Sequence, residues 1–278
     1  MRLADLVREA ARRLRRARLH YGHGTTNARD EAAFLVLRGL GLPFEAPADR
    51  EVGRREALRV ERLLQRRIRD RIPVPYLLHE AWLQDERFYV DRRVIVPRSH
   101  IAGLLRTRMR PWLVLSPKRI LDLCTGSGCL AVLAAQAFPR AHVDASDLSA
   151  GALAVAARNV AMHRLRSRVR LVRSDLFAAL RGRYDLIVCN PPYVDAASMR
   201  RLPAEYRHEP RMALASGSDG LDFVRRLLGE VPRYLTPRGA LVCEVGAGRR
   251  ALQRAYPRLP FTWTAEGNVF VLVREELG

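Results

Sequence analysis

The feature that most constrains the fold is a strand, a glycine turn and a helix within residues 119–137. The apolar run 119–123 (RILDL) has the length of a strand, Gly126 and Gly128 lie in the turn that follows, and an apolar run of helix length comes next. Glycine permits a tight turn and a close approach of the backbone to a ligand. A helix that starts there offers free N–H groups. The spacing departs from the dinucleotide fingerprint G-x-G-x-x-G, because Ala131 stands at the last position.

Strands and helices alternate from about residue 99 to the C-terminus, which predicts a parallel sheet with helices on both faces. The predicted strands are residues 119–123, 142–146, 170–173, 185–190 and 240–244, followed by an antiparallel pair near residue 262 and at 269–273. Ligands of such α/β sheets bind beyond the carboxyl ends of the strands. We therefore expect the functional residues at that edge.

The fourth predicted strand ends in Asn190, Pro191, Pro192 and Tyr193. Proline has no N–H and a fixed φ, so the carbonyls of this segment stay free of local pairing. The amide oxygen of Asn190 and the carbonyl of Pro191 can each accept one hydrogen of a planar NH2 group, and Tyr193 can cover its flat face. This geometry suits methyl transfer to a glutamine amide or to the exocyclic amine of adenine or cytosine. The alternative is a strand that simply ends in a proline-rich turn.

Acidic residues follow the second and third predicted strands. Asp147 lies about 20 residues beyond the glycines, where an acidic side chain can hold ribose hydroxyls. Asp175 and Phe177 end the third strand and suit the amine and the ring of adenine. Together with the acceptor nitrogen, these features predict S-adenosylmethionine as the cofactor. No metal is expected, because closely spaced histidine or cysteine ligands are lacking.

Taken together, the motifs DLCTGSG, DLS, SDLF and NPPYV are similar to those of the protein-glutamine methyltransferases, which modify the side-chain amide nitrogen of glutamine. Four further stretches resemble the branch that acts on the large-subunit ribosomal protein uL3. They are YGHGTTNARDEA (21–32), YLLHEAW (76–82), RVIVPRS (93–99) and LPAEYRHEPRMALASGSDGLDF (202–223). The chain departs from the family pattern at Gly103, Asp85 and Leu176.

The resemblance implies a class I S-adenosylmethionine-dependent methyltransferase with a Rossmann-like α/β domain that methylates a glutamine of a large-subunit ribosomal protein during ribosome assembly. The residues that we expect at the cofactor are Asp122, Thr125, Gly126, Ser127, Gly128, Asp147, Asp175, Leu176, Phe177 and Asn190. The expected glutamine clamp is Asn190, Pro191, Pro192 and Tyr193. The alternatives are a release-factor glutamine methyltransferase, a nucleic-acid amine methyltransferase, and a ribosome-assembly module without catalysis.

The chain divides into three parts by pattern. Residues 1–72 read as a helical substrate-recognition domain with helices to about residue 19, at 27–40 and at 54–71, separated by proline and glycine. Residues 73–98 alternate and predict a β-hairpin linker. Residues 99–278 form the predicted catalytic domain.

The N-terminus is charged throughout and lacks the apolar core of a secretory signal. No apolar run reaches the ~18 residues that a membrane span needs. We therefore expect a cytoplasmic protein without a membrane partner, whose first helix packs on its own domain, although a basic amphipathic helix can also lie on a membrane surface. The four cysteines lack metal-site spacing and are expected to be reduced and packed.

The chain carries 49 basic and 29 acidic residues, a formal balance of +20, and Lys118 is its only lysine. Arginine binds phosphate with two parallel hydrogen bonds, which favours a partner that contains RNA. The alternative explanation of the positive charge is a general bias toward arginine in the composition, with the surplus arginines on solvated helix faces. We expect the substrate to be a ribosomal protein within an RNA-containing assembly intermediate.

Overall fold

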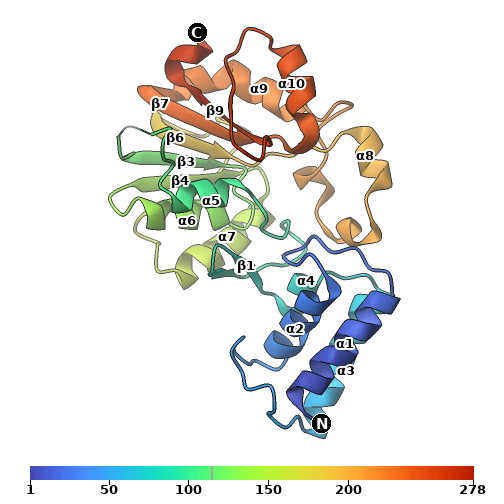
Figure 1. Cartoon of the computed structure of the whole chain (residues 1–278). Coiled ribbons are helices and arrows are strands. Elements are labelled where there is room, and N and C mark those ends of the chain that lie inside the picture. The colour runs from blue at the N-terminus through green and yellow to red at the C-terminus, as the bar shows by residue number, and fades with distance from the viewer. Residues whose placement is uncertain (114) are drawn as a thin grey trace.

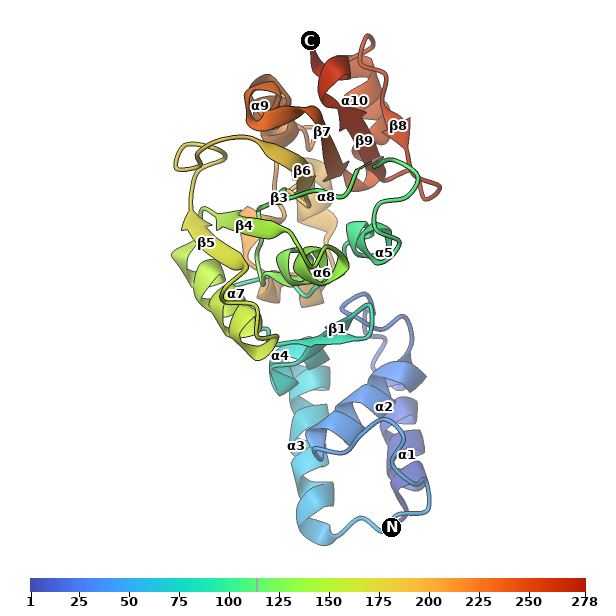
Figure 2. The same ribbon diagram turned by 90° about the vertical axis from the view of Figure 1, so that its left-hand side faces the viewer.

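The computed structural model describes residues 1–113 and 115–278. An N-terminal group of helices lies on one side of a larger domain built around a single sheet, and the two parts are joined by a short hairpin (Figures 1 and 2). The C-terminus lies at the far end of the sheet domain, away from the N-terminus (Figure 1).

Three helices form the N-terminal part: α1 (Leu3–Arg16), α2 (Ala28–Gly39) and α3 (Arg54–Arg69). Asn27 fixes the start of α2, because its side chain accepts the backbone N–H groups of residues 29 and 30. The apolar faces of the three helices share one core. The expected helices are therefore present, and α1 and α3 end two or three residues earlier than the pattern indicated.

The segment after α3 differs from the expected plain hairpin. It begins with the short helix α4 (Val74–Leu78) and only then forms β1 (Ala81–Leu83) and β2 (Glu86–Phe88). Proline stands in the first turn of α4, where its missing N–H costs nothing. Two residues with positive φ, Gln84 and Asp85, connect the antiparallel strands, as in a tight two-residue hairpin turn.

The main sheet has the order β5-β4-β3-β6-β7-β9-β8. Its strands are β3 (Arg119–Leu123), β4 (His142–Asp147), β5 (Val169–Arg173), β6 (Tyr184–Cys189), β7 (Leu235–Glu244), β8 (Thr262–Trp263) and β9 (Val269–Val273). The first five are mutually parallel, and β9 is antiparallel to both β7 and β8. This confirms the predicted parallel sheet with a closing antiparallel pair.

Helices cover both faces of the sheet (Figure 2). On one face lie α5 (Ile101–Arg106), α6 (Cys129–Ala137) and α7 (Ala150–Met162), and on the other α9 (Asp222–Glu230) and α10 (Arg249–Ala255). The remaining helical segments are α8 (Ala196–Arg201) and the 3-10 turns η1 (Ala204–His208), η2 (Arg211–Ala213), η3 (Val231–Tyr234), η4 (Gly246–Gly248) and η5 (Arg274–Leu277).

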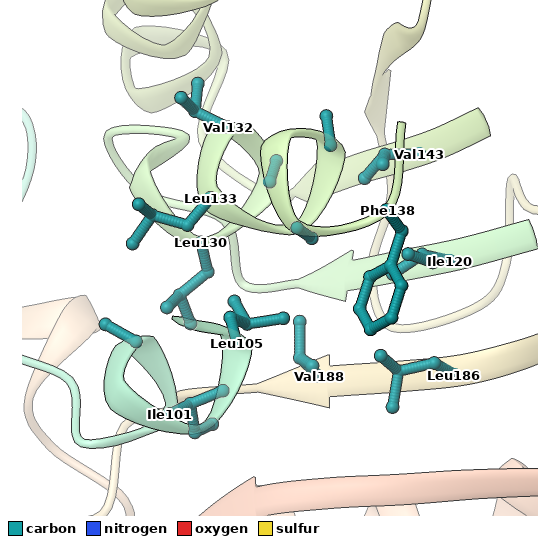
Figure 3. Packing of buried hydrophobic residues seen from close by; sticks show 14 of the residues in the cluster. Ile101, Leu105, Ile120, Leu130, Val132, Leu133, Phe138, Val143, Leu186 and Val188 are labelled. Atoms are coloured by element: carbon teal, nitrogen blue, oxygen red, sulfur yellow. The ribbon is translucent and has the colours of Figure 1, made fainter. Parts of the chain in front are cut away.

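Successive residues of the central strands point alternately into two hydrophobic cores, one on each face of the sheet. Leu186 and Val188 of β6 pack with α5 and α6, as Figure 3 shows, whereas Ile187 and Cys189 pack with α9. Such buried runs without polar alternation are typical of strands covered on both faces. Apolar burial at about 25 cal/mol per Å2 is the main force that holds these layers together.

The chain runs outward from β3 to β5 and then returns to place β6 beside β3. The point between β3 and β6, where the strand order reverses, is where ligands of open α/β sheets bind. No helix among the described residues is long and apolar enough to cross a membrane. All four cysteines are free thiols, as expected.

Candidate active site

A cavity lies at the carboxyl ends of β3, β4, β5 and β6. Its lining includes several of the predicted site residues: Gly126, Asp147, Asp175, Leu176, Asn190 and Pro192. These residues are far apart in the sequence, and the parallel register of the four strands brings their ends to one edge. The structure therefore assembles the cavity in the place that the strand pattern predicted.

The two glycines of the turn after β3 have different surroundings. Gly126 has a φ of +53°, and a Cβ built on it would meet nothing within 4 Å, so the backbone here faces open space. Gly128 has a φ of +79°, and its Cβ would lie 3.0 Å from the Cβ of Ala156 in α7. Gly126 thus leaves room for a ligand, whereas Gly128 permits the close packing of the turn on α7.

Asp122 lies behind the turn rather than in the cavity. It is fully buried and accepts hydrogen bonds from the Thr125 hydroxyl at 2.5 Å and the Ala131 N–H at 2.9 Å. Burial raises the pKa of Asp122 to about 7, although these donors oppose the rise. Ser127 is also buried, and its carbonyl accepts from Asn159. Asp122, Thr125, Ser127 and Gly128 support the turn and are not part of the cavity lining, and their expected contacts with the cofactor stay a prediction.

Asp147 at the end of β4 lines the cavity in a fixed orientation. Its Oδ2 accepts the N–H of Gly126 and its Oδ1 accepts the N–H of Ser149, both at 2.9 Å. Burial raises its pKa, an effect that these backbone donors partly offset. Each carboxylate oxygen has a further lone pair, so the group can still accept hydroxyl hydrogens from a ligand.

Of the residues at the third strand end, Phe177 does not line the cavity. It is fully buried and stacks on Tyr234, with ring centroids 4.2 Å apart, so it packs in the core, and its expected contact with an adenine ring stays a prediction. Its neighbour Leu176 has a φ of +47°, and this turn of the backbone puts Leu176 on the cavity wall instead. Asp175 is half-exposed and contacts Arg226 at 3.0 Å.

The predicted clamp follows β6. The side-chain oxygen of Asn190 is buried and has no hydrogen-bond partner among the described residues. Pro192 lines the cavity with Asn190, whereas the Tyr193 ring packs beside Gly246, whose added Cβ would lie 2.6 Å from it. The Tyr193 hydroxyl lies 3.4 Å from Oε1 of Glu244, and burial together with this carboxylate raises its pKa, so the phenol stays neutral.

Several lining residues were not predicted as site residues. Val94 and Ile95 come from the linker, Met212 from η2, and Phe223 from α9. All four lie in the stretches 93–99 and 202–223, whose resemblance to one enzyme branch is the only sequence signal for them. The apolar pattern of these residues does not by itself indicate that they reach the cavity.

The loop that follows α8 is held by two buried glutamates. Glu209 accepts two hydrogen bonds at 2.6 Å from Arg98 and one at 3.0 Å from the N–H of Val96. Glu205 accepts from Arg67 of α3 and from the N–H of His20. The loop thereby joins the N-terminal helices to the cavity, where the next residue, Pro210, forms part of the wall.

The sheet order, the glycine turn and the strand-end acids define a class I methyltransferase that uses S-adenosylmethionine. A family model described as "Methyltransferase small domain" matches residues 104–214. The catalytic domain of hMettl16, solved with an RNA hairpin, has a TM-score of 0.53 at 16% identity, covering 78% of this chain and 80% of that one, which supports the fold alone.

Curated relatives specify the family more closely. The ribosomal protein uL3 glutamine methyltransferase of Bordetella pertussis is 53% identical, with 99% of this chain and 96% of that protein covered. The proteins of the same name from Neisseria meningitidis serogroup B and Burkholderia pseudomallei are each 48% identical, and cover 99% and 98% of this chain and 94% of their own lengths. The chain therefore belongs to the family of ribosomal protein uL3 glutamine methyltransferases.

Proposed function

We propose that this protein transfers the methyl group of S-adenosylmethionine to the side-chain amide nitrogen of a glutamine in ribosomal protein uL3. The observation that carries this proposal is the buried side-chain oxygen of Asn190 on the wall of the cavity, which has no hydrogen-bond partner in the described part of the chain. A buried acceptor without a donor costs about 1–3 kcal/mol. A ligand that brings an N–H group to this oxygen recovers that energy.

For the cofactor, we propose contacts with Gly126, Asp147, Asp175, Leu176 and Asn190. The open space at Gly126 and the fixed carboxylate of Asp147 fit a ribose, and Leu176 offers an apolar surface to a base. When bound, S-adenosylmethionine supplies a methyl group on a positively charged sulfur that leaves as a neutral thioether.

The clamp compensates for the poor nucleophilicity of an amide nitrogen. Asn190 and the carbonyl of Pro191 would each accept one N–H of the substrate amide, which would orient its nitrogen toward the methyl group. As the new N–C bond forms, positive charge develops on the nitrogen, and both hydrogen bonds strengthen. The methylated nitrogen then loses one of its protons to water, so the chain needs no dedicated base. Tyr193, held by Glu244 and Gly246, forms one side of the acceptor site.

An exocyclic base amine or a release-factor glutamine would also satisfy the clamp. The names of the relatives, together with nearly complete coverage of both chains, support uL3 over these acceptors.

We further infer that uL3 is methylated while it is engaged with RNA in an assembly intermediate. A protein of charge +20 repels an isolated basic protein, whereas RNA reverses the sign of the field. Residues 1–75 carry 18 basic and 10 acidic residues, and their net charge of 18 − 10 = +8 adds to this attraction. At the amino ends of the strands, a depression is lined by Arg119, Arg166, Arg168, Arg170 and Arg181. Asp144 holds Arg170, but the side chains of Arg166 and Arg181 have no partner in the described part of the chain.

Asn190→Ala tests the clamp. We expect turnover with uL3 to fall by about 100-fold or more, the scale of losing one transition-state hydrogen bond, while the affinity for S-adenosylmethionine changes much less. The matched control is Gln136→Ala, which removes an exposed amide of α6 that contacts Glu86. Near-normal turnover of Asn190→Ala, or an equal loss in the control, would remove the clamp from the mechanism.

A further inference from the structure

A groove of about 810 Å3 lies between α2, the loop that follows it and the β1–β2 hairpin. Its inner surface is apolar and aromatic. Phe34 is buried, Phe44 is 44% exposed, and the Phe44 ring meets the edge of Trp82 with centroids 5.4 Å apart. Proline residues 43 and 75 extend this surface. An exposed aromatic ring in such a groove offers apolar contact area to a ligand.

The charge of the groove is opposite to that of the whole protein. Three exposed carboxylates line it, those of Asp30, Glu45 and Asp85, and Arg38 is the only arginine among its described lining residues. Arg38 donates to both oxygens of Glu80, at 2.6 and 3.1 Å, so its charge is already balanced.

Two of these carboxylates have partners on the chain. Asp30 accepts from the side-chain amide of Asn27. Asp85 pairs with Arg106, but both side chains are largely exposed and such a pair contributes little. The groove thus presents negative charge on a protein with a balance of +20.

The inner end of the groove reaches the loop beside the candidate active site. His23 lines the groove, its ring lies 4.6 Å from the ring of Tyr206, and its Nε2 is 3.6 Å from Glu209. The residue after Glu209 is Pro210, which lines the cofactor cavity. A ligand in the groove is therefore separated from the cavity by one loop.

The groove also accounts for two stretches that have no part in the cofactor site. Residues 23–25 and 30 belong to YGHGTTNARDEA, and Ala81 and Trp82 belong to YLLHEAW. Both stretches resemble the uL3 branch, yet neither lines the cavity at the strand ends.

From these observations we propose that the groove binds an extended basic segment of the substrate protein, next to the segment that carries the target glutamine. An apolar side chain of that segment packs on Phe44 and Trp82, and its lysine or arginine side chains face Asp30, Glu45 and Asp85. A protein that binds RNA is rich in such side chains. The groove thereby lets a strongly basic enzyme hold a basic protein, and the inference rests on uL3 being the substrate.

Steady-state kinetics with free uL3 test the groove. Glu45→Lys should raise KM about fivefold at low salt, because it replaces one exposed attractive charge pair with a repulsive one. The value of kcat should not change, because the lost contact is the same in the ground state and the transition state. Phe44→Ser should raise KM on the order of tenfold, the scale of part of a buried aromatic side chain. Affinity for S-adenosylmethionine should not change in either variant.

Matched controls lie outside the groove. Asp49→Lys makes the same charge change a few residues away, and Leu58→Ser removes a side chain of α3 that is 53% exposed. Both should leave KM unchanged. The proposal is overturned if Glu45→Lys matches its control, or if it lowers KM, since tighter binding would indicate an RNA or acidic ligand. If wild-type protein does not methylate uL3 at all, the proposed function fails instead.

Discussion

Arg67→Met tests the buried ion cluster that joins the N-terminal helices to the loop after α8. Arg67 is 1% exposed, and its guanidinium donates to Glu31 at 2.7 Å, to Glu205 at 3.3 Å and to the carbonyl of His20 at 2.9 Å. Both glutamates are 1% exposed. Methionine keeps much of the length of arginine but removes the charge, which leaves the carboxylate of Glu31 buried without a counter-charge, whereas Glu205 keeps Arg71 at 3.2 Å.

Removing one partner of a buried ion pair costs about 3–5 kcal/mol, because the remaining charge is uncompensated. We expect a loss of this size in the free energy of unfolding at pH 7.5, measured by chemical denaturation. The control is Arg69→Met, whose side chain is 79% exposed and pairs with Asp70, and which should change the free energy of unfolding far less.

The pH dependence of the same variant has a defined sign. Burial raises the pKa of Glu31 even with Arg67 in place, so the folded state holds its proton more tightly than the unfolded state does. A group with a raised pKa destabilises the fold as pH rises, and without Arg67 this effect grows. The deficit of Arg67→Met relative to wild type should therefore shrink as pH falls from 7.5 toward 5. A loss below about 1 kcal/mol at pH 7.5, or a deficit that grows on acidification, would refute this reasoning.

Three further outcomes follow from the site. Asp147→Ala should weaken S-adenosylmethionine binding by about 1.5–3 kcal/mol in calorimetry, and unchanged affinity would place the ribose elsewhere. Gly246→Ala should lower kcat with uL3 and leave cofactor affinity unchanged, because the added Cβ would displace the ring of Tyr193 and a φ of +50° is strained for alanine. A wild-type kcat would show that Tyr193 is not part of the acceptor site. Raising salt from about 50 to 200 mM should weaken binding to an RNA-bound uL3 particle, and binding that is insensitive to salt would argue against arginine–phosphate contacts.

Much of the cavity was predictable because the predicted residues share one place in the alternation of strands and helices, at or just after the carboxyl end of a strand. Asp147 ends β4, Asp175 comes two residues after β5 and Asn190 directly follows β6, and parallel strands must bring such ends together. The same pattern could not tell Leu176 from Phe177. Which of two adjacent apolar residues lines the cavity depends on the positive φ of Leu176, and no glycine marks that turn.

The contacts between the two parts of the chain could not be predicted. Arg67, Glu31 and Glu205 are separated by tens to more than a hundred residues, and each is an ordinary charged residue in its own segment. Their pairing depends on how the loop after α8 docks on α3, which is a tertiary property. Helix α4 was missed for a local reason, since Pro73 and Pro75, which suggested an extended linker, stand at the N-cap and in the first turn of this helix.

The measurement that tests the central claim most directly is the identity of the methylated atom. The protein is incubated with methyl-labelled S-adenosylmethionine and, in parallel, with free uL3, an RNA-bound uL3 particle, a peptide-chain release factor and protein-free ribosomal RNA. Mass spectrometry then locates the label. The account predicts one methyl group on the side-chain amide nitrogen of a glutamine in uL3, and almost none with the Asn190→Ala variant. Label on the release factor or the RNA in place of uL3, or on any atom of uL3 other than a glutamine amide nitrogen, would contradict it.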